Sequence, residues 1–305
     1  MAELRRTDGT RSYLLMTEHL VGRGPQCALR LSAGYVSTQH ALIRWDGVAW
    51  ELLDRGSRNG TQLNGVLLEP GRPHRLLKDS VLTFGHADER WALVDAGEPQ
   101  TMAVSLDTGH ALLGVQGLIG LPSSKSPECT LYLAQDGGWK VEQANGELES
   151  LVDGQIIECA GQKFRFCCPT SSSATEALSV ARVGAAPLLH FAVSSDEDFV
   201  ELTLEYPERR VALGSRSHNY LMLTLARRML ADRAAQLPDA SCGWMDKDAL
   251  ADGFKMTPQQ VDGEVFRIRK HFTQHGLPEA TTVIERRPRT KQIRLGLMQV
   301  RIERT

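Results

Sequence analysis

The fold of this chain is indicated by three short blocks, Gly22-Arg23, Ser37-Thr38-Gln39-His40 and Ser57-Arg58-Asn59-Gly60-Thr61. We expect an arginine, a serine and an asparagine from these blocks to lie on three successive turns. A planar guanidinium holds a phosphate through two parallel charge-assisted hydrogen bonds, and a hydroxyl and an amide fill the remaining acceptor sites. The blocks therefore predict a clamp that binds an oxyanion and does not transfer it.

The three blocks lie at the ends of predicted strands. Val21 precedes the first block, residues 41–45 follow the second, and residues 50–54 precede the third. Each is a short apolar run bounded by Gly, Asp or Ser, which is typical of a strand. Asn59-Gly60 and Asn64-Gly65 are turn dipeptides that tolerate positive φ. The pattern predicts a β fold that carries the clamp on its loops.

At these residues the chain resembles the forkhead-associated (FHA) domain family, whose pattern is GR, SxxH, SxNGT and a further NG at about this spacing. The resemblance covers roughly residues 10–96, and we assign residues 1–97 to an all-β FHA sandwich. It implies that Arg23 and Ser37 take the phosphate of a phosphothreonine. The other residues with implied roles are Arg58 beside the phosphate, Asn59 on the ligand's backbone, and Gly22, His40, Gly60 and Asn64 as structural residues, with His40 a buried brace of the loops.

Thr38 departs from the family pattern, because a basic residue often follows the serine. We keep Thr38 in the phosphopeptide-binding set, and Arg58 would restore the missing positive charge. Gly22-Arg23-Gly24 also resembles part of a nucleotide loop, but no third glycine opens a helix and no βαβ unit follows. A second alternative stays open, in which the FHA fold is retained without phosphopeptide binding.

Composition indicates a soluble, multidomain, cytoplasmic protein. The chain has 305 residues, of which 42% are hydrophobic and 24% charged, enough to bury two or three cores. No apolar run of about 18 residues is present, so we expect no membrane contact. The six cysteines include no CxxC, and we read them as small buried side chains in a reducing compartment, with no metal site and no cofactor.

Residues 98–170 repeat the order of the first domain in shorter form. Asp136-Gly137-Gly138 is a hairpin turn, and Leu118-Ile119-Gly120-Leu121 falls where the first domain has Leu20-Val21-Gly22-Arg23. Leucine replaces the arginine, and both SxxH and NGT are missing. We predict a degenerate FHA-like β domain without a phosphate site, which serves as a docking or dimerising module or as a spacer. Residues 171–187 are Ser/Ala-rich and read as a linker.

Residues 188–305 read as strands followed by helices and a hairpin. Strands are predicted at 188–193, 199–206 and 209–213, and helices at 219–236, 245–253 and 258–275. On the third helix, which has Thr257 as N-cap and proline at N1, the apolar residues are Val261, Val265, Ile268 and Phe272. From Lys255 to Arg304 the chain carries 11 basic and 5 acidic side chains, a possible footprint for a phosphate backbone.

This order resembles the winged helix-turn-helix of bacterial OmpR/PhoB-type response regulators, an α+β fold. In that family the third helix enters the major groove and the wing touches the adjacent minor groove or backbone. The residues that would face duplex DNA are Gln259, Gln260, Glu264, Arg267 and Lys270 on the helix and Arg286, Arg287, Arg289 and Lys291 on the wing. Asp262 and Glu264 would oppose phosphate. A winged helix that contacts protein, or a solvated charged face, remains the alternative.

Two functions follow, and neither is enzymatic, since no paired nucleophile and base, metal spacing or phosphate-transferring loop is found. In the first, an FHA reader couples a Ser/Thr kinase to transcription through DNA binding. In the second, the protein is a phosphothreonine-dependent adaptor whose winged helix docks another protein. Its partners would be a phosphothreonine peptide, a Ser/Thr kinase, duplex DNA and, in the docking role, a second copy as a homodimer.

Overall fold

The computed structural model describes residues 1–134, 136–169, 187–296 and 299–304. The chain divides into two compact units. One consists of Met1–Thr101 with a return segment that begins at Cys167, and the other of Met102–Phe166 with the C-terminal part of the chain. The predicted linker, apart from Pro187, lies outside the described residues.

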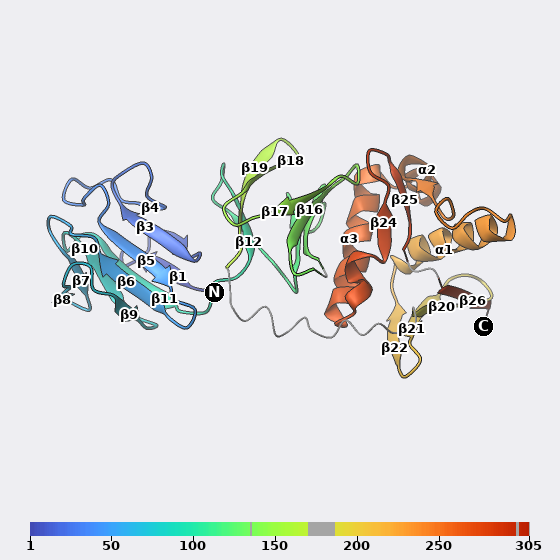
Figure 1. Ribbon diagram of the computed structural model, residues 1–305, viewed down its shortest axis with the longest axis horizontal. Coiled ribbons are helices and arrows are strands. Elements are labelled where there is room, and N and C mark those ends of the chain that lie inside the picture. Colours follow the sequence, from blue (N-terminus) through green and yellow to red (C-terminus); the bar gives the residue numbers. More distant parts are fainter. Residues whose placement is uncertain (135, 170–186, 297–298, 305) are drawn as a thin grey trace. The chain divides into compact units, whose positions relative to one another are not determined.

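The first unit is built from two sheets that enclose one core. The six-stranded sheet has the order β2 (Ser12–Leu14), β1 (Glu3–Arg6), β11 (Arg90–Asp95), β10 (Val81–Phe84), β7 (Thr61–Leu63) and β8 (Val66–Leu67). The five-stranded sheet has the order β4 (Leu29–Arg30), β3 (Glu18–Gly22), β5 (Ala41–Trp45), β6 (Trp50–Asp54) and β9 (His74–Leu76) (Figure 1). Alternate residues of these strands, such as Ile43 and Leu52, point into a core that also buries Trp50, Phe84 and Trp91.

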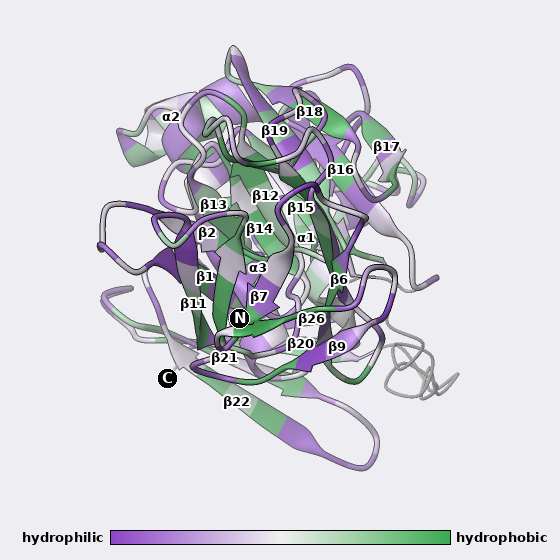
Figure 2. Ribbon diagram, turned by 90° about the vertical axis from the view of Figure 1, so that its left-hand side faces the viewer, coloured by the Kyte–Doolittle hydropathy of each residue, from purple (hydrophilic) through white to green (hydrophobic). Residues whose placement is uncertain are grey.

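The second unit begins with a β module of two four-stranded sheets. The first has the order β13 (Ala111–Leu113), β12 (Met102–Ser105), β19 (Gln162–Cys167) and β18 (Ile156–Cys159), and the second β14 (Leu118–Leu121), β15 (Cys129–Leu133), β16 (Trp139–Gln143) and β17 (Leu148–Leu151). Figure 2 shows hydrophobic residues along strands such as β14, all four of whose residues are buried.

A disulfide between Cys129 and Cys159 corrects the expectation that all six cysteines are unpaired. It joins β15 of one sheet to β18 of the other, where the two Cα atoms are 6.3 Å apart. Because the two residues are 30 positions apart in the sequence, only the packing of the sheets brings them together.

The described residues of the rest of the second unit form two sheets and three α-helices. The elements are β20 (Leu188–Val193), β21 (Val200–Glu205), β22 (Arg210–Ser215), α1 (Asn219–Ala234), β23 (Met245–Asp246), α2 (Lys247–Phe254), α3 (Pro258–Gln274), the 3-10 helix η1 (Pro278–Thr281), β24 (Ile284–Arg286), β25 (Gln292–Leu295) and β26 (Gln299–Arg304). Strands β22, β21, β20 and β26 form one sheet, and β23, β25 and β24 another. The sequence interpretation missed β26, which pairs in parallel with β20.

Local sequence explains the helix boundaries. The helix predicted to begin at Pro258 does so, with Thr257 and Gln260 forming a capping box. The helix predicted from Met245 begins two residues later, because Met245 and Asp246 form a strand against β25 and the Asp246 side chain then caps α2. No helix among the described residues has the length and apolarity needed to span a membrane.

Candidate functional site

Three loops of the first unit meet at one end of its sheets. The Ser37 hydroxyl accepts a hydrogen bond from the Arg58 backbone N–H at 3.0 Å, and the Asn59 amide donates to the Tyr35 carbonyl at 2.8 Å. The Arg23 backbone N–H donates to the Ser37 carbonyl at 2.9 Å. The three sequence blocks are thus joined directly by hydrogen bonds.

The buried His40 side chain connects two of these loops. Its side chain is fully buried, Nδ1 accepts from the Ser37 N–H at 3.0 Å, and Nε2 lies 3.1 Å from the Gly60 carbonyl. A neutral ring with its hydrogen on Nε2 satisfies both partners. Burial lowers the pKa of His40, although the hydrogen bond to Gly60 partly opposes this shift. A neutral imidazole therefore fixes the loop geometry.

Asp54, which the sequence interpretation did not single out, anchors the third loop. Its carboxylate accepts hydrogen bonds from the N–H groups of Gly56 and Ser57, both at 2.8 Å, and from the hydroxyls of Ser57 and Thr61, at 2.6 and 2.5 Å. Burial alone would raise the pKa of Asp54, but these hydrogen bonds outweigh it and the pKa is lowered. The acidic end of the apolar run 50–54 was the available sequence signal.

Two glycines are required by close approaches in these loops. A Cβ on Gly22 would lie 2.6 Å from the Thr38 carbonyl oxygen. Gly60 has a φ of +79°, and a Cβ there would lie 2.5 Å from the Leu67 side chain. Asn64 also has positive φ, and its side-chain oxygen accepts from the Val81 N–H at 2.8 Å.

The side chains that would meet a ligand are exposed around this framework. Arg23, Thr38, Arg58 and Asn59 are exposed, and Ser37 is half-buried. The Arg23 side chain makes one long hydrogen bond, from Nε to the Val36 carbonyl at 3.4 Å, and has no ion pair within the described part of the chain. Its terminal nitrogens remain available for the two parallel bonds that a phosphate accepts.

The residues predicted to face DNA differ in their exposure and in their hydrogen-bonding and ion-pair partners. Gln259, Arg267, Arg287, Arg289 and Lys291 are exposed. Gln260 is exposed but uses its side-chain oxygen to accept from the Thr257 N–H, and Lys270 is half-buried at an apolar pocket lined by Leu118 and Phe266. Four of the basic groups form ion pairs with carboxylates: Arg267 with Glu264, itself predicted to face DNA, Arg286 with Glu142 and Asp262, Arg289 with Glu147, and Lys291 with Asp248.

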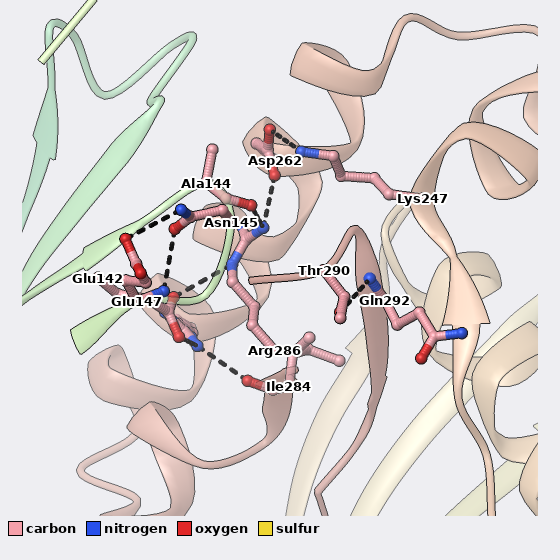
Figure 3. Close-up of polar contacts among 11 residues, drawn as sticks. Glu142, Ala144, Asn145, Glu147, Lys247, Asp262, Ile284, Arg286, Thr290 and Gln292 are labelled. Atoms are coloured by element: carbon pink, nitrogen blue, oxygen red, sulfur yellow. Dashed lines mark hydrogen bonds and ion pairs between the residues drawn. The ribbon is translucent and has the colours of Figure 1, made fainter. Parts of the chain in front are cut away.

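A buried ion-pair network joins the β module to α3 and the hairpin β24–β25. The Arg269 guanidinium bonds both carboxylate oxygens of Glu142, at 2.5 and 3.1 Å, and the side chains are 1% and 7% exposed. Figure 3 shows Arg286 between Glu142 and Asp262. Its Nε lies 3.2 Å from Glu142 Oε2, and one of its terminal nitrogens lies 2.7 Å from Asp262 Oδ1. Burial would raise the pKa of Glu142, but the charges of Arg269 and Arg286 and the hydrogen bonds they donate together outweigh burial, and the pKa is lowered.

Apolar contacts continue this network along one side of α3. Phe266 packs in a cluster with Leu118, Tyr132 and Ala134 of the β module. A Cβ on Gly120 would lie 3.1 Å from the Phe266 ring. The sequence interpretation placed the buried face of α3 only on the side of Val261 and Phe272, whereas the structure buries the opposite side as well.

Known proteins resemble the first unit. A family model for the FHA domain matches residues 19–85. Mediator of DNA damage checkpoint protein 1 from Mus musculus is 34% identical over 92 residues, which make up 28% of this chain and only 5% of that protein. Among solved structures, an FHA domain studied for phosphothreonine-dependent interactions is 29% identical, with 32% of this chain and 98% of that chain covered and a TM-score of 0.28. The FHA domain of FhaA, solved in complex with the intracellular domain of a second protein, is 31% identical, with 30% and 98% covered and a TM-score of 0.27. The match to the family model shows that the N-terminal unit of this chain contains an FHA domain.

Proposed function

We propose that this chain is a cytoplasmic, non-enzymatic reader of phosphothreonine that couples a Ser/Thr kinase to transcription. One observation carries the first half of the proposal. The Ser37 hydroxyl accepts a hydrogen bond from the Arg58 backbone N–H at the end of the FHA sheets. Beside it, the Arg23 guanidinium has no carboxylate partner among the described residues. A phosphate placed there would receive two parallel hydrogen bonds from Arg23 and a further one from the Ser37 hydroxyl, with Arg58 beside it, and the exposed Asn59 amide would bond the ligand's backbone.

Phosphopeptide binding is tested with the full chain and a pool of peptides that have a fixed phosphothreonine and randomised flanks. Arg23→Ala should weaken binding by about 2 to 5 kcal/mol, the usual effect of truncating one partner of a hydrogen-bonded charge pair. Arg75→Ala is a matched control, since Arg75 is exposed on β9 at the opposite edge of the same sheet. Equal affinity for phosphorylated and unphosphorylated pools would refute this half.

The second half is that residues 188–305 form a winged helix that binds duplex DNA. It is supported by the order of sheet, three helices and hairpin, and by the exposed basic side chains on α3 and on the turn between β24 and β25. We propose that Gln259, Arg267, Arg287, Arg289 and Lys291 make the contacts. We assign Arg286 and Glu264, named from sequence as DNA-facing, to internal ion pairs instead, because both are largely buried.

DNA binding is tested by electrophoretic shift of the full chain at several salt concentrations. Replacing Arg287, Arg289 and Lys291 by alanine should flatten the salt slope by roughly one unit for each DNA phosphate that the variant no longer neutralises. Replacing Arg209 and Arg210, at the start of β22, removes two basic side chains elsewhere and should leave the slope unchanged.

The adaptor function remains the second candidate because one observation favours it. The α3 helix and the hairpin already contact protein, through Arg269, Arg286 and Phe266 against the β module. In this alternative the C-terminal part docks protein and the FHA domain supplies the phosphothreonine dependence. A full chain without salt-dependent DNA affinity at low ionic strength would make the adaptor the better proposal.

A further inference from the structure

A second basic feature of the FHA unit lies beside Arg23. Arg11, Arg23, Arg30 and Ser32 line one open pocket. Arg11 precedes β2, Arg23 follows β3, and Arg30 ends the neighbouring strand β4. All four residues are exposed. Three guanidiniums from three segments therefore converge on one hollow at the edge of the candidate phosphate site.

The fold holds these arginines together without neutralising them. The Arg30 Nε donates to the Arg23 carbonyl at 3.4 Å, and the Arg11 guanidinium lies 5.7 Å from the centre of the Trp91 ring. Within the described residues, none of the three has an ion pair. Other arginines of this unit do find carboxylates, as Arg6 and Arg44 show. The hollow is thus a local excess of positive charge.

One phosphate does not balance that excess. A phosphothreonine carries about −1.5 to −2 charges at pH 7. Arg23 and Arg58 together already match this charge, so Arg11 and Arg30 would still line the same hollow without an anionic partner. Like charges within a Debye length, about 10 Å at 0.1 M salt, repel each other, and an anion between them removes the repulsion.

We propose that the hollow of Arg11, Arg23 and Arg30 binds a second anionic group of the ligand, close in sequence to its phosphothreonine. This inference rests on the proposed phosphothreonine reading and narrows the ligand class. The group is a carboxylate or a second phosphate, since both accept the paired donors of a guanidinium. The Ser32 hydroxyl lines the same pocket and supplies a further donor.

The test compares three pools of peptides on the full chain, each with one fixed phosphothreonine and otherwise randomised flanks without acidic residues. The first pool has no second anion, the second has a glutamate, and the third has another phosphothreonine, placed in turn at each position up to three residues away. Affinities are measured for the wild type, Arg11→Ala, Arg30→Ala and the control Arg75→Ala. Thermal midpoints check that the variants fold.

We expect the second anion to improve binding by about tenfold or more at its best position, as a charge-assisted hydrogen bond does. The gain should fall in Arg11→Ala and Arg30→Ala, persist in Arg75→Ala, and shrink as salt is added. A larger gain from glutamate than from phosphate identifies a carboxylate, and the reverse identifies a second phosphate. If the first pool binds and no second anion adds affinity, or if both hollow variants keep the gain, the inference is overturned while phosphothreonine reading stands. If none of the pools binds, the proposed function itself fails and the inference falls with it.

Discussion

The Glu142 carboxylate is the most informative side chain to remove from the second unit. Glu142→Ala would leave Arg269, which is 1% exposed, without its carboxylate partner, and would also take one partner from Arg286. Breaking a buried ion pair by deleting one partner usually costs about 3 to 5 kcal/mol, because the remaining charge stays desolvated. For a unit of this size, each kcal/mol lowers the thermal midpoint by about 2 to 4 °C. We therefore expect a fall on the order of 10 °C.

Glu147→Ala is the matched control, because it removes another glutamate of the β16–β17 hairpin region that also pairs with a C-terminal arginine. Its partner Arg289 is 85% exposed and Glu147 itself 43%. Exposed pairs of this kind contribute about 0 to 1 kcal/mol. The two variants remove the same charge, so the difference between their thermal midpoints reports the burial of Glu142 and its pairing with two arginines.

Thermal denaturation and hydrogen exchange of the α3 amides measure the effect. Glu142→Ala should accelerate exchange in α3 around Phe266 and Arg269, since the β module would no longer be held on that face. A double variant, Glu142→Leu with Arg269→Met, should recover much of this stability, as apolar replacement of a complete buried pair often does. If Glu142→Ala costs no more than Glu147→Ala, the reasoning that this network fixes the β module on α3 is refuted.

Three further predictions concern other parts of the chain. Gly22→Ala should lower the thermal midpoint of the FHA unit and weaken phosphopeptide binding, because the added Cβ would lie 2.6 Å from the Thr38 carbonyl oxygen. Overpacking of this kind costs about 1 to 3 kcal/mol of stability. An unchanged melting curve would contradict this prediction. Burial lowers the pKa of His40 from 6.5, so the unfolded state binds more protons than the folded state below that pH. The contribution of His40 to stability should be complete above about pH 6.5 and should decline as pH falls toward the folded pKa. His40→Gln should flatten this part of the plot of stability against pH. Gly146→Ala should weaken the packing of the β module against the β24–β25 hairpin, because Gly146 has a φ of +78° and a Cβ there would lie 3.0 Å from the Arg286 Cβ. We expect faster hydrogen exchange at the Arg286 amide and no change in phosphopeptide affinity.

Local patterns predicted what depends on neighbouring residues. The blocks around Gly22, Ser37 and Asn59 identified the FHA domain, which the family model confirms for residues 19–85. Thr257 and Pro258 marked the start of α3 because capping is decided within one turn. The assignment of winged helix and the division of the second unit into domains stay predictions.

Long-range pairing could not be predicted in this way. Glu142 and Arg269 are 127 residues apart, and neither belongs to a motif. The side of α3 with Asp262, Phe266 and Arg269 mixes two charges with one aromatic ring, so its pattern resembles a solvated face. Arg11 and Arg30 stand in different segments, and only the pairing of β1 with β2 and of β3 with β4 sets their positions beside Arg23.

Whether an arginine already has a carboxylate partner decides how readily it can bind an anionic ligand. In the FHA unit, Arg11, Arg23 and Arg30 have no carboxylate partner within the described residues, so a phosphate there would displace no carboxylate. In the second unit, DNA would have to displace a carboxylate from Arg286, Arg289 or Lys291, whereas Arg287 has no carboxylate partner within the described residues. Displacing Asp262 and Glu142 from the buried Arg286 would cost about as much as breaking a buried pair, several kcal/mol, whereas displacing Glu147 from the exposed Arg289 would cost about 1 kcal/mol or less. In the proposed DNA complex, a phosphate would therefore recruit Arg289, Lys291 and Arg287 while Arg286 stays in its internal network. Arg289→Ala should then lower DNA affinity without loss of stability, whereas Arg286→Ala should lower the thermal midpoint first.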